Sequence, residues 1–175
     1  MSITLETDRL LLRPFTESDA LMASLNSRQP KVAEEMSDMV LQDEEAGLKW
    51  INWINEKANV NQPWQVLAIV LKDVNLCIGL VGVIPQPKIH GEVEILFAVS
   101  DCYQNKGYAT EAAQKLVEWF FSTKEDSYLC AIVKIKNIPS QRVVEKLGFT
   151  HLEDREIVFD GKPTMFKYYR LRCVE

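Results

Sequence analysis

A short polar loop between a predicted strand and a predicted helix carries the residues best suited to chemistry. It runs from Val99 through Gln104, Gly107 and Ala109 into a long amphipathic segment. The start of a helix presents backbone N–H groups without helical acceptors and the positive end of the helix dipole, which together bind phosphate well. Gly107 also lets the backbone approach a ligand closely. The loop indicates a phosphate site; a strand–helix connection that needs glycine only for its geometry is the alternative.

The elements that must position this loop follow from the pattern of apolar residues. The strongest helix signal is Gly107–Ser122, whose apolar residues recur along one face: Ala109, Ala112, Ala113, Leu116, Val117 and Phe120. Other helices are predicted over residues 16–26, 43–58 and 139–147. Strands are predicted over residues 4–15, 64–71, 77–84, 92–99, 128–135, 157–159 and 165–171. Pro85-Gln86-Pro87 is expected to end the third strand, and Asp160-Gly161 to turn the last hairpin. This order predicts a mixed α/β sheet with helices.

Composition restricts the class of protein. The 175 residues, 47% of them hydrophobic and 26% charged, suit one globular domain over residues 1–175, and no linker divides them. A net charge of −5 argues against nucleic acid as a partner. The four cysteines lack metal-type spacing and only two histidines are present, so no metal is expected. The polar start and the absence of a long apolar run predict a cytoplasmic protein that does not contact membranes.

Three ordered motifs resemble the GNAT superfamily of N-acetyltransferases. Gln104–Ala109 matches every defined position of that family's pyrophosphate loop, Gln/Arg-x-x-Gly-x-Gly/Ala. Tyr103–Ala112, with its Glu111, is similar to the branch that contains the ribosomal-protein N-terminal acetyltransferases. Asn137–Phe149 resembles the second motif of that branch, and Thr7–Pro14 resembles its opening strand. The resemblance extends from about residue 7 to residue 171.

The resemblance implies a sheet that is splayed at the site of acetyl-CoA, the expected cosubstrate. Backbone amides of the loop would hold the pyrophosphate; they belong to Gln104, Asn105, Lys106, Gly107, Tyr108, Ala109 and Thr110. The pantetheine arm would lie along Phe97, Ala98 and Val99 and hydrogen-bond the strand backbone like an added strand. Asn137 would contact the pantetheine or substrate region, and Ser140 would lie near the sulfur. Helix capping explains both residue types equally well.

Glu94 aligns with a glutamate of the branch that faces the acetyl group, so the resemblance makes it the candidate general base. A free α-amine has a pKa of about 8 and a lysine amine about 10, so a base assists attack near neutral pH. Strand alternation places Glu92 and Glu94 on one face and Ile95 and Phe97 on the other. The alternatives are that Glu94 is a solvated strand residue, or that it only orients the substrate.

The sequence departs from the family pattern in two places. Leu96-Phe97 replaces the usual Gly-Tyr, which puts the shape of the acceptor pocket in doubt. Val144 stands where many members carry a tyrosine general acid, so Ser140, solvent or another tyrosine would protonate the leaving thiolate.

The leading hypothesis is acetyl transfer to a primary amine, either a protein N-terminus or a small amine, by direct attack and without an acetylated Cys102. The alternative is a non-catalytic CoA-binding or sensor module on the same fold. A nucleotide-binding protein is disfavoured because no Gly-Lys-Ser/Thr motif follows the loop. The acidic runs at residues 34–35 and 43–45 either line an acceptor cleft or are solvated, and a homodimer through the terminal strands is an open option.

Overall fold

Eight strands form one sheet in the computed structural model, which describes residues 3–58, 63–123 and 128–173. In chain order they are β1 (Leu5–Glu6), β2 (Leu10–Pro14), β3 (Gln65–Leu71), β4 (Leu76–Gln86), β5 (Glu92–Val99), β6 (Tyr128–Lys134), β7 (Thr150–Phe159) and β8 (Lys162–Arg172). Their order across the sheet is β1-β2-β3-β4-β5-β6-β8-β7, and every neighbouring pair is antiparallel except β5 with β6. The predicted mixed, mostly antiparallel sheet is confirmed.

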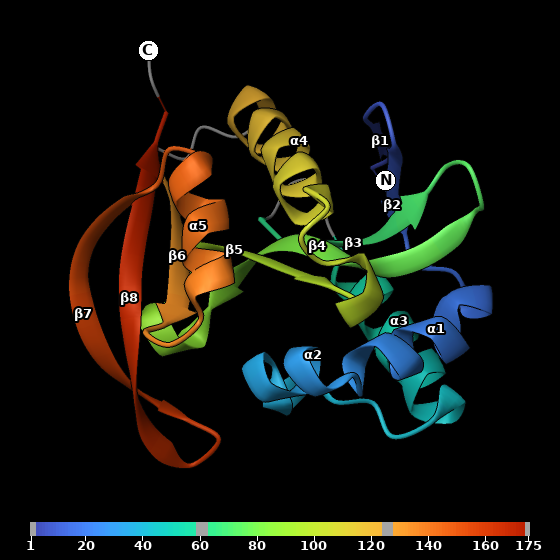
Figure 1. The fold of residues 1–175 in the computed structure, drawn as a ribbon, viewed down its shortest axis with the longest axis horizontal. Coiled ribbons are helices and arrows are strands. Elements are labelled where there is room, and N and C mark those ends of the chain that lie inside the picture. Colours follow the sequence, from blue (N-terminus) through green and yellow to red (C-terminus); the bar gives the residue numbers. More distant parts are fainter. Residues whose placement is uncertain (1–2, 59–62, 124–127, 174–175) are drawn as a thin grey trace.

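Helices cover both faces of this sheet (Figure 1). They are α1 (Ala20–Ser27), α2 (Pro30–Glu35), α3 (Glu44–Lys57), α4 (Tyr108–Thr123) and α5 (Ile138–Lys146), with short 3₁₀ turns η1 (Glu17–Asp19), η2 (Ser37–Met39), η3 (Pro87–Ile89) and η4 (Asp101–Tyr103). Helices α4 and α5 lie on one face, and α1, α2 and α3 lie on the other. Within the described residues, none of the helices has the length and apolar character needed to cross a bilayer.

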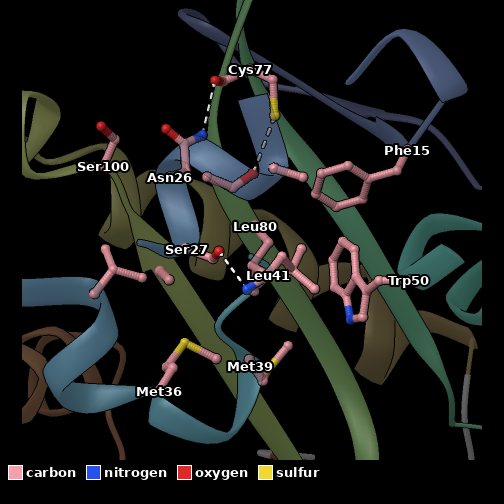
Figure 2. A pocket seen from close by; sticks show the side chains of 14 residues that line it. Phe15, Asn26, Ser27, Met36, Met39, Leu41, Trp50, Cys77, Leu80 and Ser100 are labelled. Atoms are coloured by element: carbon pink, nitrogen blue, oxygen red, sulfur yellow. Dashed lines mark hydrogen bonds between the residues drawn. The ribbon is translucent and has the colours of Figure 1, made fainter. Parts of the chain in front are cut away.

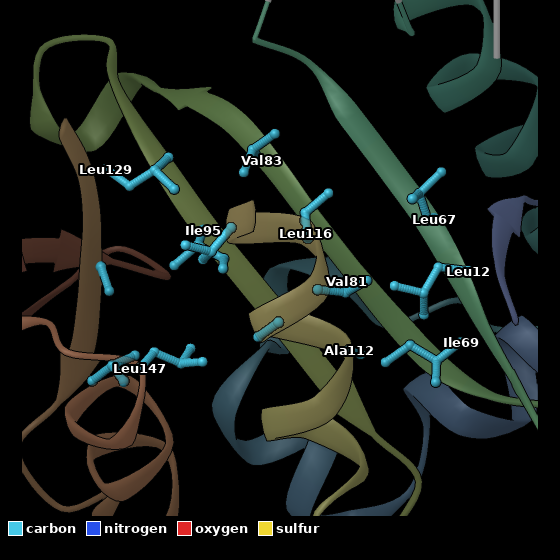
Figure 3. Close-up of a cluster of buried hydrophobic side chains, with 14 of the residues drawn as sticks. Leu12, Leu67, Ile69, Val81, Val83, Ile95, Ala112, Leu116, Leu129 and Leu147 are labelled. Atoms are coloured by element: carbon cyan, nitrogen blue, oxygen red, sulfur yellow. The ribbon is translucent and has the colours of Figure 1, made fainter. Parts of the chain in front are cut away.

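The main core lies between α4 and the sheet (Figure 3). Ala112, Leu116 and Phe120 of α4 are fully buried there against strand residues such as Val81 and Ile95. Burying a leucine or phenylalanine side chain stabilises a fold by about 1.5–3 kcal/mol, so this apolar stripe fixes how α4 sits on the sheet. The predicted helical face is therefore confirmed, except that Ala109 is only half-buried and borders a groove.

Both faces of the central strand β3 are covered. Leu67, Ile69 and Leu71 face the α4 core, while the alternate residues Val66 and Ala68 face α1 and α3. A strand that is buried on both faces has an uninterrupted apolar sequence, as Gln65–Leu71 nearly does. Helices α1 to α3 also pack against apolar residues of the sheet, so both of its faces are covered.

The limits of two predicted strands were wrong. The predicted strand over residues 4–15 is two strands, because the chain turns at Thr7, whose N–H donates to the carbonyl of Leu10 at 3.0 Å. Strand β4 continues through Pro85 to Gln86. The β3–β4 register ends at Gln65–Val83, so the missing N–H of Pro85 removes no bond from that ladder.

The terminal hairpin is longer than predicted, although its turn is at the expected place. Asp160 and Gly161 both have positive φ, 53° and 73°, as a two-residue hairpin turn requires. Strand β7 begins at Thr150, seven residues before the predicted start. Its first residues are mostly exposed and polar, so no alternation of apolar side chains marks them, and pairing with β8 alone makes them a strand.

Helix α2 and turn η2 were not predicted. Pro30 at the first turn of α2 is the available signal, because proline suits that position. The helix has only six residues and buries one of them, Val32, so it lacks a periodic apolar stripe. Its importance is positional, since α2 and η2 form one wall of the groove described next.

Candidate active site

Strands β5 and β6 separate along their length and open a groove between them. They run parallel, and within the described residues their register consists of the single pair Glu94–Cys130. Beyond that pair, residues 95–99 of β5 and 131–134 of β6 line opposite sides of the groove. The splay that the family resemblance implied is therefore present, and it begins at Glu94.

The edge of β5 directs backbone groups into this groove. The N–H of Ser100 donates to the carbonyl of Ile78 in β4 at 2.8 Å. Because backbone directions alternate along a strand, the groups of Phe97 and Val99 point away from β4, toward the gap. The carbonyl of Val99 already accepts a hydrogen bond from Gln104 Nε2 at 2.9 Å. The backbone of Phe97 and the N–H of Val99 therefore offer a ligand the hydrogen bonds of a missing strand.

Glu92, which lies on the same face of β5 as Glu94, links the start of β5 to β6 and β8. Glu92 Oε2 accepts from the hydroxyls of Tyr128 and Tyr168 at 3.0 and 2.7 Å, and from Arg170 Nη2 at 3.1 Å. Burial alone raises the pKa of Glu92, but the hydrogen bonds from Tyr168, Cys130 and Tyr128 bring it below its ordinary value. This network holds the strands together at one end, so the gap opens only beyond Glu94.

The predicted phosphate loop lies at the open end of the groove. Asn105 and Gly107 both have positive φ, 59° and 81°, which turns the chain into α4. The N–H of Glu111 donates to the carbonyl of Gly107, so the amides of residues 108–110 precede the first helical hydrogen bond. The loop residues that line the groove are Gln104, Asn105, Gly107, Tyr108, Ala109 and Thr110. Lys106 is not among the lining residues.

Arg9 anchors this loop, a role that sequence analysis missed. Its Nη1 donates to the carbonyl of Lys106 at 3.0 Å, and its Nε donates to Glu111 Oε2 at 2.7 Å. Thr7 Oγ1 donates to the other carboxylate oxygen of Glu111. Although burial raises the pKa of Glu111, the bonds from Thr7 and Arg9 lower it below the ordinary value. The opening-strand motif, Thr7–Pro14, and the pyrophosphate-loop motif therefore form one clamp around the start of α4.

We expect Arg9→Ala to raise the KM for acetyl-CoA about threefold to tenfold while kcat changes little. The Arg9 side chain is 47% exposed, so its loss acts through the freed Lys106 carbonyl more than through stability. Steady-state kinetics with varied acetyl-CoA measure this, and Lys49→Ala, which breaks the exposed Lys49–Glu45 pair, is the control. An unchanged KM for Arg9→Ala would show that the loop keeps its shape without this clamp.

Glu94 is buried where the groove begins. Only 7% of the residue is exposed, which excludes the solvated carboxylate considered from sequence. Its Oε2 accepts from Gln86 Nε2 at 2.6 Å, and the carboxylate also accepts from the backbone N–H of Ile132. Burial raises the pKa of Glu94 to about 7 in spite of those two bonds. A carboxylate has about four lone-pair positions, so it can still accept a proton.

Gln86 has a fixed orientation toward Glu94. Its Oε1 accepts the backbone N–H of Lys88 at 3.2 Å, which leaves its NH₂ group to donate to Glu94. The bond lies across the β4–β5 ladder, where Ile84 pairs with Glu94. The carboxylate is therefore held by a side chain whose amide cannot flip without losing a bond.

Acidic residues of α2 and η2 form the wall of the groove opposite β5 and β6. Glu34, Glu35 and Asp38 all line the groove. Lys88 Nζ pairs with Asp38 Oδ2 at 2.9 Å, and Lys134 Nζ donates to the carbonyl of Glu34. The first acidic run thus borders the groove. The second does not, because Asp43–Glu45 is exposed at the start of α3, where Asp43 caps Ala46 N–H.

The second motif brings Asn137 and Ser140 to the groove, and capping is confirmed for Asn137. Its Oδ1 accepts the backbone N–H of Ser140 at 3.2 Å, and both residues line the groove. Val144 is fully buried and has no polar atom, so it cannot donate a proton. Leu96 lines the groove as expected from its position. The described part of the chain brings no three His, Cys, Asp or Glu residues together as a metal site would require.

Comparisons with known proteins agree with this geometry. Residues 9–150 match the family described as Acetyltransferase (GNAT) domain. The uncharacterized N-acetyltransferase YjdG of Bacillus subtilis is 38% identical over 93 residues, 53% of this chain and about half (55%) of that protein's length. The uncharacterized N-acetyltransferase YnaD of the same organism is 31% identical over 144 residues, 81% of this chain and 79% of that protein.

A solved structure supports the same fold. The ribosomal-protein-S5-alanine acetyltransferase from Vibrio fischeri superimposes with a TM-score of 0.78 at 18% identity, covering 97% of this chain and 96% of that one. The structural neighbours therefore include the ribosomal-protein acetyltransferases to which the motifs pointed. With its family match over residues 9–150, the splayed sheet and the loop at the start of α4, the chain belongs to the GNAT acetyltransferases and is an N-acetyltransferase that uses acetyl-CoA.

Proposed function

We propose that the chain transfers the acetyl group to a primary amine, a protein N-terminus or a small amine, with Glu94 as the general base of a direct attack. The observation that carries this proposal is the buried Glu94 carboxylate, with a pKa of about 7, at the point where β5 and β6 separate. A base is most effective when its pKa lies near the working pH. The name of the Vibrio fischeri neighbour, which acts on a ribosomal-protein alanine, supports a protein N-terminus as one acceptor.

The residues that line the groove support a place for each part of acetyl-CoA. Backbone amides of residues 104–110 would hold the pyrophosphate at the start of α4, where helical N–H groups lack acceptors. The pantetheine arm would lie between β5 and β6 and bond the backbone of Phe97 and Val99, beside Ala98. Asn137 and Ser140 border the same groove from α5 and would contact its thioester end.

The reaction needs two proton transfers. Glu94, directly or through a water molecule, removes a proton from the acceptor ammonium and frees its lone pair. The amine nitrogen then forms a bond to the thioester carbonyl carbon, and the carbon–sulfur bond breaks. The departing thiolate takes a proton from Ser140 or from water, because Val144 has none to give, and the second proton that the attacking nitrogen loses as the amide forms replaces it. The products are an N-acetyl amine and CoA.

A panel of amines and N-terminal peptides with acetyl-CoA, followed by thiol release, tests this function. Transfer to at least one primary amine is the expected result. A CoA-binding module without catalysis would instead show calorimetric binding of CoA and no thiol release above the background. Because Leu96 stands where the family pattern has glycine, the panel should include both small and extended amines.

We expect Cys102→Ala to retain full turnover. Cys102 is exposed in η4, within the loop that leads to α4, and direct transfer forms no acetyl-enzyme. Steady-state kinetics and mass spectrometry of the enzyme after acetyl-CoA treatment measure this, with Cys173→Ala as the matched control. Lost turnover together with a trapped acetyl group on Cys102 would overturn direct attack.

A further inference from the structure

The acidic wall of the groove, formed by α2 and η2, has few apolar contacts. Together these two elements bury a single residue, Val32. Met36 and Met39 line a small apolar pocket between this wall and the sheet (Figure 2). The pocket has a free volume of about 30 Å³, which is too small for a ligand, so its lining residues serve packing alone. Polar contacts across the groove therefore contribute to holding the wall in place.

Two lysines from the other side of the groove make such contacts. Lys88 Nζ of η3 pairs with Asp38 Oδ2 at 2.9 Å, and Lys134 Nζ of β6 donates to the carbonyl of Glu34. Both ammonium groups also lie 4.5 Å from the centre of the Phe159 ring, whose face attracts cations. The same two side chains therefore join the α2–η2 wall to the end of β7.

Lys88 also connects the wall to Glu94. Its backbone N–H donates to Gln86 Oε1 at 3.2 Å, and Gln86 Nε2 donates to Glu94 Oε2 at 2.6 Å. The side chain of Lys88 is thus held by Asp38, while its backbone fixes the amide that holds the carboxylate. One continuous series of contacts extends from the acidic wall through η3 to the point where the groove begins.

We propose that Asp38 and Lys88 are positioning residues for Glu94: their ion pair holds turn η3 across the groove and, through Gln86, keeps the Glu94 carboxylate in place. The α2–η2 wall then contributes to the reaction through the base, and not only by shaping the groove. This inference rests on the function proposed above, in which Glu94 is the general base.

The two partners of this ion pair act on Glu94 in opposite directions. Burial has the largest effect on the pKa of Glu94 and raises it, and beyond burial the Lys88 ammonium lowers this pKa while the Asp38 carboxylate raises it. Glu92, on the same face of β5, is engaged by Tyr168 and Arg170. A pair that only packed the wall would give the same result whichever partner was removed, so opposite effects distinguish a positioning role.

Titration of the Glu94 carboxyl carbon by NMR, in protein labelled with ¹³C-glutamate, tests the link without any acceptor. Glu94→Gln identifies the resonance by its absence. Lys88→Met should move the titration midpoint upward by about half a pH unit, the size expected for one charge in partly solvated surroundings. Asp38→Asn should move it downward by a similar amount, and the double variant should lie near the native midpoint because the two losses cancel.

Lys134→Met is the matched control. It also removes an ammonium group from Phe159 and a contact with α2. Lys134 lies four residues beyond Cys130, the strand partner of Glu94, which is about 13 Å along β6. Its loss should therefore leave the midpoint unchanged, as should Lys88→Arg, which keeps the charge. Thermal melting confirms that each variant is folded.

The pH dependence of kcat, measured with an amine from the panel that reacts, separates this inference from the proposed function. The rise of kcat with pH should follow the Glu94 midpoint in every variant. Shifts of Lys88→Met and Asp38→Asn in the same direction, or no shifts, overturn the positioning role, while loss of activity in Glu94→Gln would still uphold the base. If the midpoints move as expected and kcat does not follow them, the link to Glu94 is supported and the proposed base is wrong.

Discussion

Glu94→Gln should lower kcat by about 10²–10⁴-fold, the range that a general base contributes. The variant keeps the shape of the side chain and can still accept a hydrogen bond from Gln86, but it cannot take a proton from the acceptor. In the native enzyme the activity should rise with pH through about 7, as Glu94 ionises. The variant should lack that rise. A pH series of kcat with a peptide acceptor measures both effects.

The same substitution should stabilise the fold at alkaline pH. The folded-state pKa of about 7 lies above the ordinary 4.5, so the folded protein binds this proton more tightly than the unfolded chain does. Native stability is therefore lost as the pH rises from about 4.5 through about 7. The change in the free energy of unfolding that Glu94→Gln causes should be more favourable above pH 7 than at pH 4, by on the order of 3 kcal/mol. Urea unfolding at several pH values measures the difference.

Glu92 supplies a control of opposite sign on the same strand. Its folded pKa is lowered, so its ionised form contributes stability above the ordinary value and this is lost as the pH falls through the folded pKa. Glu92→Gln should therefore destabilise the protein most at neutral and alkaline pH. If Glu94→Gln and Glu92→Gln showed the same pH dependence of unfolding, the opposite pKa shifts of Glu94 and Glu92 would be wrong.

Gly107→Ala should raise the KM for acetyl-CoA at least tenfold. Gly107 has φ of +81°, a conformation that costs a residue with a Cβ about 1–2 kcal/mol. An added Cβ would lie 3.4 Å from Arg9 Nη2, so relief of the strain would move both the loop and its anchor. Residues 108–110 directly follow Gly107, so this movement would also change the directions in which their backbone N–H groups point. Kinetics and calorimetry with CoA measure the loss.

Gly161→Ala is the matched control for that prediction. Gly161 has φ of +73° at the tip of the β7–β8 hairpin, and an added Cβ there meets no atom within 4 Å. Both variants should lose similar stability, but only Gly107→Ala should lose affinity for CoA. An equal rise in KM for both would mean that general strain, and not the loop at α4, controls cofactor binding.

Local pattern was sufficient for the elements with strong periodicity. The apolar stripe of α4 and the alternation of β5 follow from residues close in sequence, and the structure confirms both, since the odd-numbered residues of β5 join the core under α4. The same holds for the turn at Asp160-Gly161, whose residue types suit positive φ. Helix α2 was missed because six residues with one buried side chain carry no period, and the contacts that hold it, such as the bond from Lys134 to the carbonyl of Glu34, come from residues distant in sequence.

By itself the sequence determined the family, the sheet with its helices and the loop at the start of α4, because these depend on short motifs and on spacing. Tertiary structure alone decided the environment of each charged group. The pKa of Glu94 depends on burial and on Gln86, which lies on a neighbouring strand, and the loop depends on Arg9, which lies 102 residues from Glu111. Desolvation and contact act through space, so no local pattern in the chain could report them.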